Sequence, residues 1–493
     1  MRAESGGHDF GDLGAIGAIG WRGLALLMLG GLQTGLLVAG SGAAVATQLL
    51  VVLGAAGVGS LALLWIASDS RFSRTPLWWI LGLALVLRLV AVQADPLLED
   101  DHYRYLWDGF RTVQGFDPYR LAPSAYFAAP ELTVPWQQVL SGINNPGIPT
   151  LYGPVLQALF AGAHLLAPGR IGAIQGLLVL VDMGCLLLLA RHAVGARWLL
   201  AYALHPLILK EAMASAHPDG LVALWLLLAS MTWQRGRLHW TGALLGLAVA
   251  TKMAALVVVP LFLLGPPRGG SFWRTARALA LGFVAVLGLA YAPFVAVGGS
   301  DIVGLQTFAA QWRFNPLLFR VVEAGVPTGM ARPVALGLIA AGVAAVAWHW
   351  RAVSIAGAEG HDAPPIDRAL LLLILLAPVV NPWYALWALA PAVAARRPLV
   401  AVLGCVGVLA YLNSSVLREA GWLTATEPAA PFAVAWPIAL AQVAALALAI
   451  VWMHGRNRCN KHSAHPEQCT APTEREGEAI RARPPARTPM SGP

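Results

Sequence analysis

Long apolar stretches alternate with short polar breaks over most of the 493-residue chain. Four clear apolar stretches are residues 24–40, 177–189, 278–290 and 438–453. They approach the roughly 20 residues that cross the hydrocarbon of a bilayer as a helix. Backbone N–H and C=O groups find no outside partner in lipid, so such segments satisfy them as helices. The pattern predicts an all-α polytopic membrane protein, with about 12 to 14 transmembrane helices.

Composition agrees with this prediction. Apolar residues make up 58% of the chain and charged residues 12%, which is about half the charged fraction of soluble domains. No soluble core could absorb this much Leu, Ala and Val, so a soluble globular protein is excluded. The first apolar segment begins near Ile16 and another follows directly, which indicates an uncleaved helix rather than a signal peptide.

The net charge of +8 comes from basic residues that punctuate the apolar segments and collect after Met453. This placement is typical of the positive-inside rule, and it argues against nucleic acid as a partner. Cys185 and Cys405 lie within apolar segments, whereas Cys459 and Cys469 lie in the basic tail. The cysteines therefore indicate no disulfide framework.

Six arginine clusters lie in short breaks between apolar segments, and we expect all of them in the cytoplasm. They are Arg71 with Arg74, Arg191 with Arg197, Arg235 with Arg237, Arg268 with Arg274 and Arg277, Arg351 with Arg368, and Arg396 with Arg397. Two spans before Arg71 then leave the N-terminus inside as well. The third span, residues 77–94, delivers a long polar loop, residues 95–149, to the outside. A second external loop is expected at residues 299–332.

The arginine positions also limit how often the chain crosses between them. Only one crossing fits between the first external loop and Arg191, so residues 151–166 are predicted to be re-entrant or interfacial. Residues 242–264 must hold two short crossings that turn near Thr251 and Lys252, and residues 370–394 two that turn near Asn381 and Pro382. Both turns face outside. Residues 1–453 then form a transmembrane domain, and residues 454–493 a disordered, basic cytoplasmic tail.

The tail carries four residues of the metal-ligand type, namely Cys459, His462, His465 and Cys469. Their spacing is compatible with a zinc ion. A flexible tail with scattered histidines and cysteines is the simpler interpretation.

The first external loop opens with an acidic, amphipathic segment. It reads Glu99-Asp100-Asp101-His102-Tyr103-Arg104-Tyr105-Leu106-Trp107-Asp108-Gly109. As a helix along the membrane surface, it would carry Asp101, Arg104, Asp108 and Arg111 on one polar stripe. Alternating ion pairs would explain that stripe structurally. Three successive acids are harder to explain in this way, because clustered carboxylates raise one another's pKa, and they suit a general base or a metal ligand.

Seven further motifs follow between about Leu77 and Ala394. They are Gly115-Phe-Asp117-Pro118-Tyr119, Asn145-Pro-Gly-Ile-Pro149-Thr150-Leu-Tyr152-Gly-Pro154, His205-Pro-Leu-Ile-Leu-Lys210-Glu211, Ser215-Ala-His217-Pro-Asp219, Ala250-Thr251-Lys252, Trp312-Arg313-Phe314-Asn315 and Asn381-Pro382-Trp383-Tyr384. Together with the acidic opening, which is the most specific part, they resemble the GT-C glycosyltransferases, particularly bacterial mannosyltransferase-like members. Asp117 departs from the resemblance, since relatives often carry Asn there.

The resemblance implies a GT-C-like bundle and a hexosyltransferase, most simply a mannosyltransferase. Its donor would be a polyprenyl-phosphate sugar, attacked with inversion by a glycan, glycolipid or protein acceptor that the sequence does not identify. The protein would be multi-pass in the inner, cytoplasmic membrane, with cytoplasmic termini and an external active site. The resemblance assigns no certain cofactor and leaves open a divalent cation held by Glu99, Asp100 and Asp101 with the donor phosphate. Consecutive acids cannot all point one way on a helix, so no metal ligand is assigned.

The resemblance also implies roles for single residues. Asp101 is the predicted general base, because in the superfamily the catalytic Asp precedes an Arg-Tyr pair by three residues, and Asp100 is the alternative. Binding of the donor and its phosphate is expected of Arg104, Tyr105, Lys210, His217, Asp219, Lys252, Trp383 and Tyr384. Residues expected in the substrate-facing loops are Asp108, Tyr152, Arg313 and Asn315.

Several of these residues also have plain structural explanations. Lys210 with Glu211 would make an interhelical ion pair, His217 would be an ordinary interfacial histidine, and Lys252 would snorkel to the boundary. Trp383 and Tyr384 would belong to an aromatic belt at the membrane interface.

Two other functional classes share the lipid environment. A transporter or flippase of a lipid-linked or anionic substrate would place charged groups near the middle of several spans. A membrane polysaccharide polymerase or ligase would carry its chemistry in late loops, whereas here the acidic motif is early.

Overall fold

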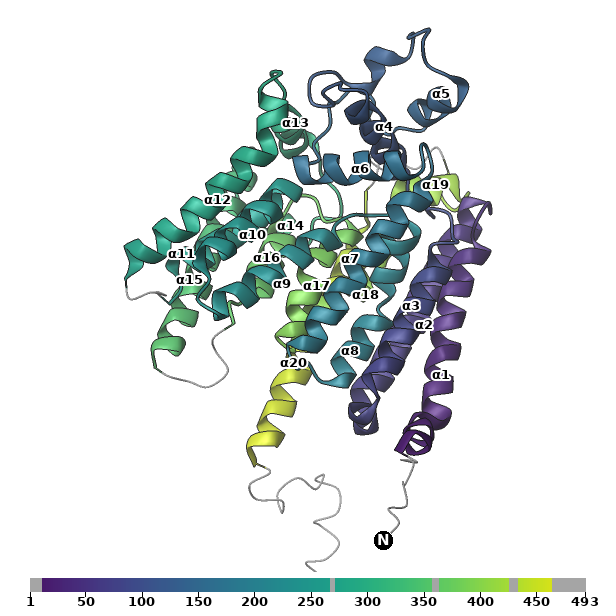
Figure 1. The fold of residues 1–493 in the computed structure, drawn as a ribbon. Helices are drawn as coiled ribbons and strands as arrows, with labels where there is room; N and C mark the ends of the chain where they lie inside the picture. Colours follow the sequence, from purple (N-terminus) through teal and green to yellow (C-terminus); the bar gives the residue numbers. More distant parts are fainter. Residues whose placement is uncertain (1–10, 267–270, 357–362, 425–432, 463–493) are drawn as a thin grey trace, which may run out of the picture. The chain divides into compact units, whose positions relative to one another are not determined.

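The protein is described from a computed structural model, which covers residues 11–266, 271–356, 363–424 and 433–462. Within these residues the chain is helical, with two isolated β-bridges and no strand (Figure 1). This confirms the predicted all-α class. The chain divides into two compact units, residues 1–445 and 446–493.

The first unit begins with three packed helices, α1 (Gly11–Ala39), α2 (Val45–Ser68) and α3 (Leu77–Ala91), with η1 (Ser70–Arg74) between the last two. The loop of residues 95–149, predicted to be external, contains α4 (Asp101–Val113), η2 (Pro123–Tyr126) and α5 (Val134–Ser141). The central helices follow: α6 (Pro154–Leu166), α7 (Ile171–Arg191), α8 (Ala196–Ala203), η3 (Ile208–Ala214), α9 (Gly220–Gln234) and α10 (Leu238–Thr251). Helix α7 packs against both α3 and α9, which joins the two groups.

The later elements complete the first unit. They are η4 (Met253–Val258), α11 (Val259–Leu264), α12 (Phe272–Val295), α13 (Ile302–Gln311), α14 (Phe319–Gly325), α15 (Ala331–Ile355), α16 (Ile366–Leu376), η5 (Pro382–Ala385), α17 (Leu386–Ala394), α18 (Leu399–Gly407), η6 (Val408–Tyr411) and α19 (Ser414–Glu419). Helix α17 packs against α9, and η5 against η3, so a late segment returns to the centre of the bundle. Helix α20 (Trp436–His462) continues past Met453, where the transmembrane domain was predicted to end. His465 and Cys469 of the tail motif lie outside the described residues.

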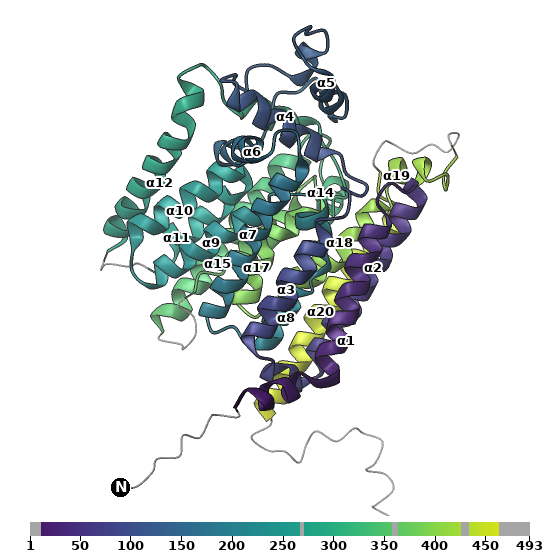
Figure 2. The ribbon, with the colours of Figure 1, turned by 45° about the vertical axis from the view of Figure 1, so that its right-hand side comes forward.

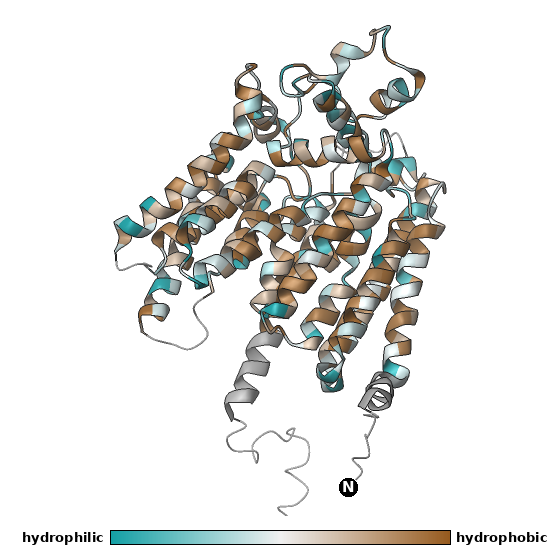
Figure 3. Ribbon diagram, in the orientation of Figure 1, coloured by the Kyte–Doolittle hydropathy of each residue, from teal (hydrophilic) through white to brown (hydrophobic). Residues whose placement is uncertain are grey.

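Five helical segments in the described part of the chain are long and apolar enough to cross a membrane, namely Gly20–Ala39, α2, α7, α12 and α15. Seven shorter apolar helices accompany them. Large apolar side chains face outward, and Leu289 and Leu180, for example, are 77% and 70% exposed. Figure 3 shows apolar residues along the outer helices and polar residues in many of the turns. Such exposed apolar surface suits lipid rather than water.

Three of the turns that carry arginine clusters lie together. The turns between α2 and α3, between α7 and α8, and between α17 and α18 lie at one end of the first unit, and the loop with α4 and α5 lies at the other (Figures 1 and 2). Two predicted helix breaks are confirmed, since α10 ends at Thr251 and a second break precedes Pro382. Helix α6 runs across the direction of α7 in both views, as expected of a segment that does not cross.

Candidate active site

The chain between α8 and α9 leaves α-helical geometry where the motifs lie. Lys210 and Glu211 belong to η3, a π-helix. Ala216 then has a φ of 58°, in the left-handed region that residues with a Cβ rarely adopt. This turn places His217 inside the protein, fully buried. Such π-turns and strained residues concentrate at functional sites.

Asp101 is the first residue of α4, and two neighbours hold its carboxylate. The Asn144 side-chain amide donates to Asp101 Oδ1 at 2.8 Å and also contacts Asp100, while the Tyr152 hydroxyl donates to Asp101 Oδ2 at 3.3 Å. About a fifth of the Asp101 side chain, 19%, is exposed. The carboxylate is therefore fixed in orientation while one side of it remains accessible.

His217 connects α4 with η3. Its Nε2 lies 3.8 Å from Asp101 Oδ2, and its Nδ1 lies 3.3 Å from Glu211 Oε2. The imidazole stacks on the ring of Trp383, with 3.8 Å between centroids and 13° between planes. Trp383 itself is buried. An interfacial histidine and an aromatic-belt tryptophan are both wrong as explanations of these two residues, because both lie inside the protein and contact each other.

Lys252 is the second cation near Asp101. Lys252 Nζ is 3.4 Å from Asp219 Oδ1, which also accepts a hydrogen bond from Trp387 Nε1 at 2.5 Å. Tyr384 stacks on Trp387, with 4.3 Å between ring centroids. Lys252 Nζ also lies 5.1 Å from the centre of the Tyr152 ring. Lys252 is thus paired inside the site and does not snorkel towards lipid.

A third group surrounds Tyr411 at the end of η6. Its hydroxyl lies 2.7 Å from Glu99 Oε1 and 3.0 and 3.2 Å from the two carboxylate oxygens of Glu211. Lys210 Nζ contacts the same hydroxyl and lies 3.2 Å from Glu211 Oε2. Lys210 and Glu211 are neighbours on one π-helix, so the interhelical ion pair expected as the structural alternative is wrong.

The local electrostatics favour a charged pair between Asp101 and His217. Burial alone would raise the pKa of Asp101, but His217, Asn144 and Lys252 together outweigh it and lower this pKa to about 2. For His217, burial works against the proton, while Asp101 and Glu211 raise its pKa to about 9. Burial and the neighbouring Asp101 carboxylate raise the pKa of Asp100. Near neutral pH the pair is a carboxylate beside an imidazolium.

Two glycines allow these elements to approach. A Cβ at Gly109 would lie 2.4 Å from the carbonyl oxygen of Phe160, where α4 crosses α6. A Cβ at Gly153 would lie 2.1 Å from the carbonyl oxygen of Ala250, where α6 begins beside the end of α10. No side chain fits at either place. These contacts bring Asp101 and Tyr152 to the same side as Lys252.

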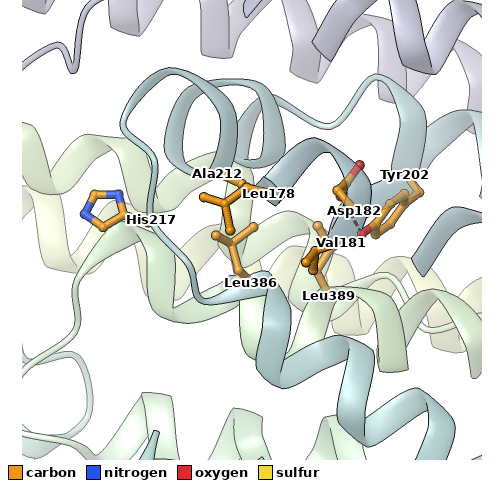
Figure 4. A pocket seen from close by; sticks show the side chains of 9 residues that line it. Leu178, Val181, Asp182, Tyr202, Ala212, His217, Leu386 and Leu389 are labelled. Carbon is orange, nitrogen blue, oxygen red and sulfur yellow. Dashed lines mark hydrogen bonds between the residues drawn. The ribbon is translucent and has the colours of Figure 1, made fainter. Parts of the chain in front are cut away.

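A small cavity of about 10 Å³ lies behind His217, with room for roughly one water molecule. Asp182 and Tyr202 line its far side, with apolar side chains such as Leu386 between them and His217 (Figure 4). Asp182 accepts hydrogen bonds from Arg88 at 2.6 Å and from the Tyr202 hydroxyl at 2.7 Å. Arg88 and Asp182 were not singled out from the sequence. Each is a charged residue within an apolar segment, and such residues indicate a paired or functional group inside a helix bundle.

Some predicted site residues stabilise the loop of residues 95–149. Arg104 donates to the backbone carbonyls of Asn145 and Ile148, and Asp108 accepts from Gln157. The alternating ion pairs expected along α4 are therefore wrong, because backbone carbonyls and an amide take their place. Three of the four residues of the polar stripe, Arg104, Asp108 and Arg111, are buried.

Three more predicted residues lie outside the carboxylate cluster. Tyr105 is fully buried, with its ring 5.2 Å from that of Tyr152 and 6.5 Å from that of His217. Arg313 pairs with Glu323. Asn315 donates to the carbonyl oxygen of Val380 at 3.3 Å and so connects the loop of residues 299–332 to the turn before Pro382.

Sequence reasoning missed three residues that complete the cluster, namely Asn144, Trp387 and Tyr411. Asn144 directly precedes the motif that begins at Asn145, and Trp387 lies three residues after Tyr384 on the same short helical run. Tyr411 ends an apolar segment at the predicted external side. A search for polar and aromatic residues at that end would have found them. Among the described residues, no group of three or more His, Cys, Asp or Glu side chains is arranged to hold a metal ion.

Comparison with known proteins gives two matches. Residues 17–265 match the family model described as alpha-(1->6)-mannopyranosyltransferase, N-terminal domain. A "Probable alpha-(1->6)-mannopyranosyltransferase" of Mycolicibacterium smegmatis (strain ATCC 700084 / mc(2)155) is 26% identical over 392 residues. That match covers 67% of this chain and 66% of the relative, just under two thirds of its length. No solved structure matches significantly. Because the family model covers half of the chain, the protein belongs to the alpha-(1->6)-mannopyranosyltransferase family.

Proposed function

We propose that the protein is an integral membrane glycosyltransferase of the GT-C type. It transfers mannose from a polyprenyl-phosphate donor to a glycan, glycolipid or protein acceptor, and it does so with inversion at the external face of the inner membrane. The observation that carries the proposal is the carboxylate of Asp101 beside the cation of His217, at the loop end of an apolar helix bundle. Membership of a mannosyltransferase family supports the choice of sugar.

Asp101 acts as the general base in this proposal. The acceptor hydroxyl attacks C1 of the sugar, its proton passes to an Asp101 oxygen, and the bond from C1 to the phosphate oxygen breaks with the electron pair on the phosphate. The low pKa of Asp101, about 2, keeps it ionised at all physiological pH values. Such a weak base suffices when proton transfer is late, because the hydroxyl becomes strongly acidic as its oxygen bonds to C1.

Cations at the same site stabilise the departing phosphate. The ammonium of Lys252 has three N–H donors, and among the described residues its carboxylate partner is Asp219. The imidazolium of His217 is held flat by the Trp383 stack. Fixed positive groups near developing negative charge are a large source of catalysis. His217 and Lys252 are therefore the proposed phosphate-binding cations.

A transporter is the less supported alternative. Arg88 and Asp182 do lie within α3 and α7, as a transport path would require. However, Arg88 is fully buried and pairs with Asp182 and with a backbone carbonyl, and apolar side chains separate the pair from His217. A buried pair of this kind fits helix packing.

The function is tested with purified protein in lipid nanodiscs. With polyprenyl-phosphate mannose and a mannooligosaccharide acceptor, we expect a product one mannose longer with the anomeric configuration inverted. Polyprenyl-phosphate glucose and GDP-mannose serve as competing donors. Transfer from GDP-mannose but not from the lipid-linked sugar would exclude the proposed donor.

The proposed sidedness is tested by cysteine labelling in intact cells. Ser124 lies exposed in the loop with η2, and Ser70 lies exposed beside the first arginine cluster. We expect a membrane-impermeant maleimide to label Ser124→Cys in intact cells and Ser70→Cys only after permeabilisation, with the unsubstituted protein as background control. The reverse pattern would place the acidic loop in the cytoplasm.

A further inference from the structure

The hydroxyl of Tyr411 has more partners than one phenol proton can serve. A phenol has one proton to donate and two lone pairs to accept with. Here Lys210 donates to one lone pair, and two carboxylates, Glu99 and Glu211, lie within hydrogen-bond distance of the same oxygen. The phenol can donate to only one carboxylate, so the other must carry a proton of its own to bond to the second lone pair.

Glu99 is the better place for that extra proton. Glu211 is in contact with two cations, Lys210 and His217, which favour its ionised form. Glu99 has no ion pair among the described residues and meets the cluster through the Tyr411 hydroxyl. Burial raises the pKa of Glu99 to about 8, and the cations Lys210 and His217 offset only part of that rise.

We propose that Glu99 and Tyr411 are positioning residues of the site, with Glu99 held as a neutral acid that donates to Tyr411, which in turn donates to Glu211. The charged groups around this chain are Lys210 and Glu211 on η3, His217 in the following loop, and Asp101 on α4. With Glu99 neutral, two carboxylates balance two cations. With Glu99 ionised, the cluster carries one excess negative charge.

The functional consequence rests on the proposed function, because it concerns an anionic, phosphate-linked donor. A donor phosphate that approaches His217 meets a balanced cluster below the pKa of Glu99 and a negative one above it. If only the protonated form binds, KM for the donor rises roughly fourfold between pH 7 and pH 8.5, as the protonated fraction falls. The value of kcat should change much less.

The proton itself is tested without any substrate. Infrared difference spectra of the protein between pH 6 and pH 9.5 should contain a carboxylic-acid band that titrates near pH 8 and is absent from Glu99→Gln. The matched control Glu131→Gln, at an exposed acid of the same loop, keeps the band. In Tyr411→Phe the Glu99 band should titrate at lower pH, because Glu99 loses the oxygen to which it donates. The matched control Tyr291→Phe removes a similar hydrogen bond to Asp301 and leaves the midpoint of the Glu99 band unchanged.

The functional part is tested by steady-state kinetics of the same variants. Glu99→Gln, a permanently neutral mimic, should retain transfer at pH 7 and lose the rise in donor KM up to pH 8.5. If Glu99→Gln keeps the wild-type rise in donor KM with pH, the charge-balance role of Glu99 is wrong. If the carboxylic-acid band is unchanged in Glu99→Gln, Glu99 does not carry the proton. Failure of the proposed function is distinct, because a protein that transfers no mannose can still show the band that depends on Glu99.

Discussion

Asp101→Asn is expected to lower the rate of mannose transfer by about 10²- to 10⁴-fold, the contribution of a positioned general base. The amide keeps the size of the carboxylate but cannot accept the acceptor's proton. The Asn144 and Tyr152 contacts of Asp101 involve oxygens, one of which the amide retains, so the loop should still fold. The measurement is single-turnover transfer of radiolabelled mannose, together with retention of the lipid donor on the purified variant.

Two other carboxylates of residues 95–149 provide controls for that experiment. Asp117→Asn should leave transfer unchanged, because Asp117 accepts a backbone hydrogen bond from Tyr119 that an asparagine oxygen also accepts. Asp100→Asn should have a smaller effect than Asp101→Asn, since Asp100 contacts Asn144 but not His217. If Asp100→Asn abolishes transfer and Asp101→Asn does not, the base is Asp100.

His217→Gln is expected to lower kcat/KM by about 10²- to 10³-fold, similar to the loss of one fixed group that stabilises transition-state charge. The substitution removes a cation, the link between Asp101 and Glu211, and the flat stack on Trp383. It also has a signature in the pH profile. Without His217, less opposes the effect of burial and the pKa of Asp101 rises, so activity should begin to fall at a higher pH on the acid side than in the unsubstituted enzyme.

The matched control for this prediction is His164→Gln, on α6 beside Phe110 and Trp136, which should change neither the rate nor the acid side of the profile. Thermal unfolding of both variants in detergent separates misfolding from lost chemistry. A His217→Gln enzyme with reduced rate but an unshifted acid limb would mean that His217 does not control the charge of Asp101.

The larger features of the fold could be predicted because they depend on the lipid and water that surround the chain. Lipid requires helices, and arginines mark one side, so the breaks at Lys252 and before Pro382 came from counting crossings. The main cluster could be predicted because its residues lie in short motifs at one end of their segments. These motifs contain Asp101, His217 and Lys252.

The partners of these residues could not be predicted, because tertiary packing selects them. Glu99 and Tyr411 are 312 positions apart, and no local pattern relates them. Arg104 was spaced for ion pairs along α4, yet the loop from Asn145 to Ile148 offers it backbone carbonyls that need a donor. The spacing of residues along a helix shows which side-chain pairs are possible. Buried carbonyl groups that lack a donor then decide which of these pairs form.

The contacts at Gly109 and Gly153 have a mechanical consequence. Side chains between helices can change rotamer and let the helices slide, but at these two places backbone meets backbone with nothing between. We therefore expect α4, α6 and α10 to move as one rigid body during a catalytic cycle. If the donor is the proposed polyprenyl-phosphate sugar, its prenyl chain then enters through a gap between helices that are not joined in this way, while Asp101 and Lys252 keep a constant separation.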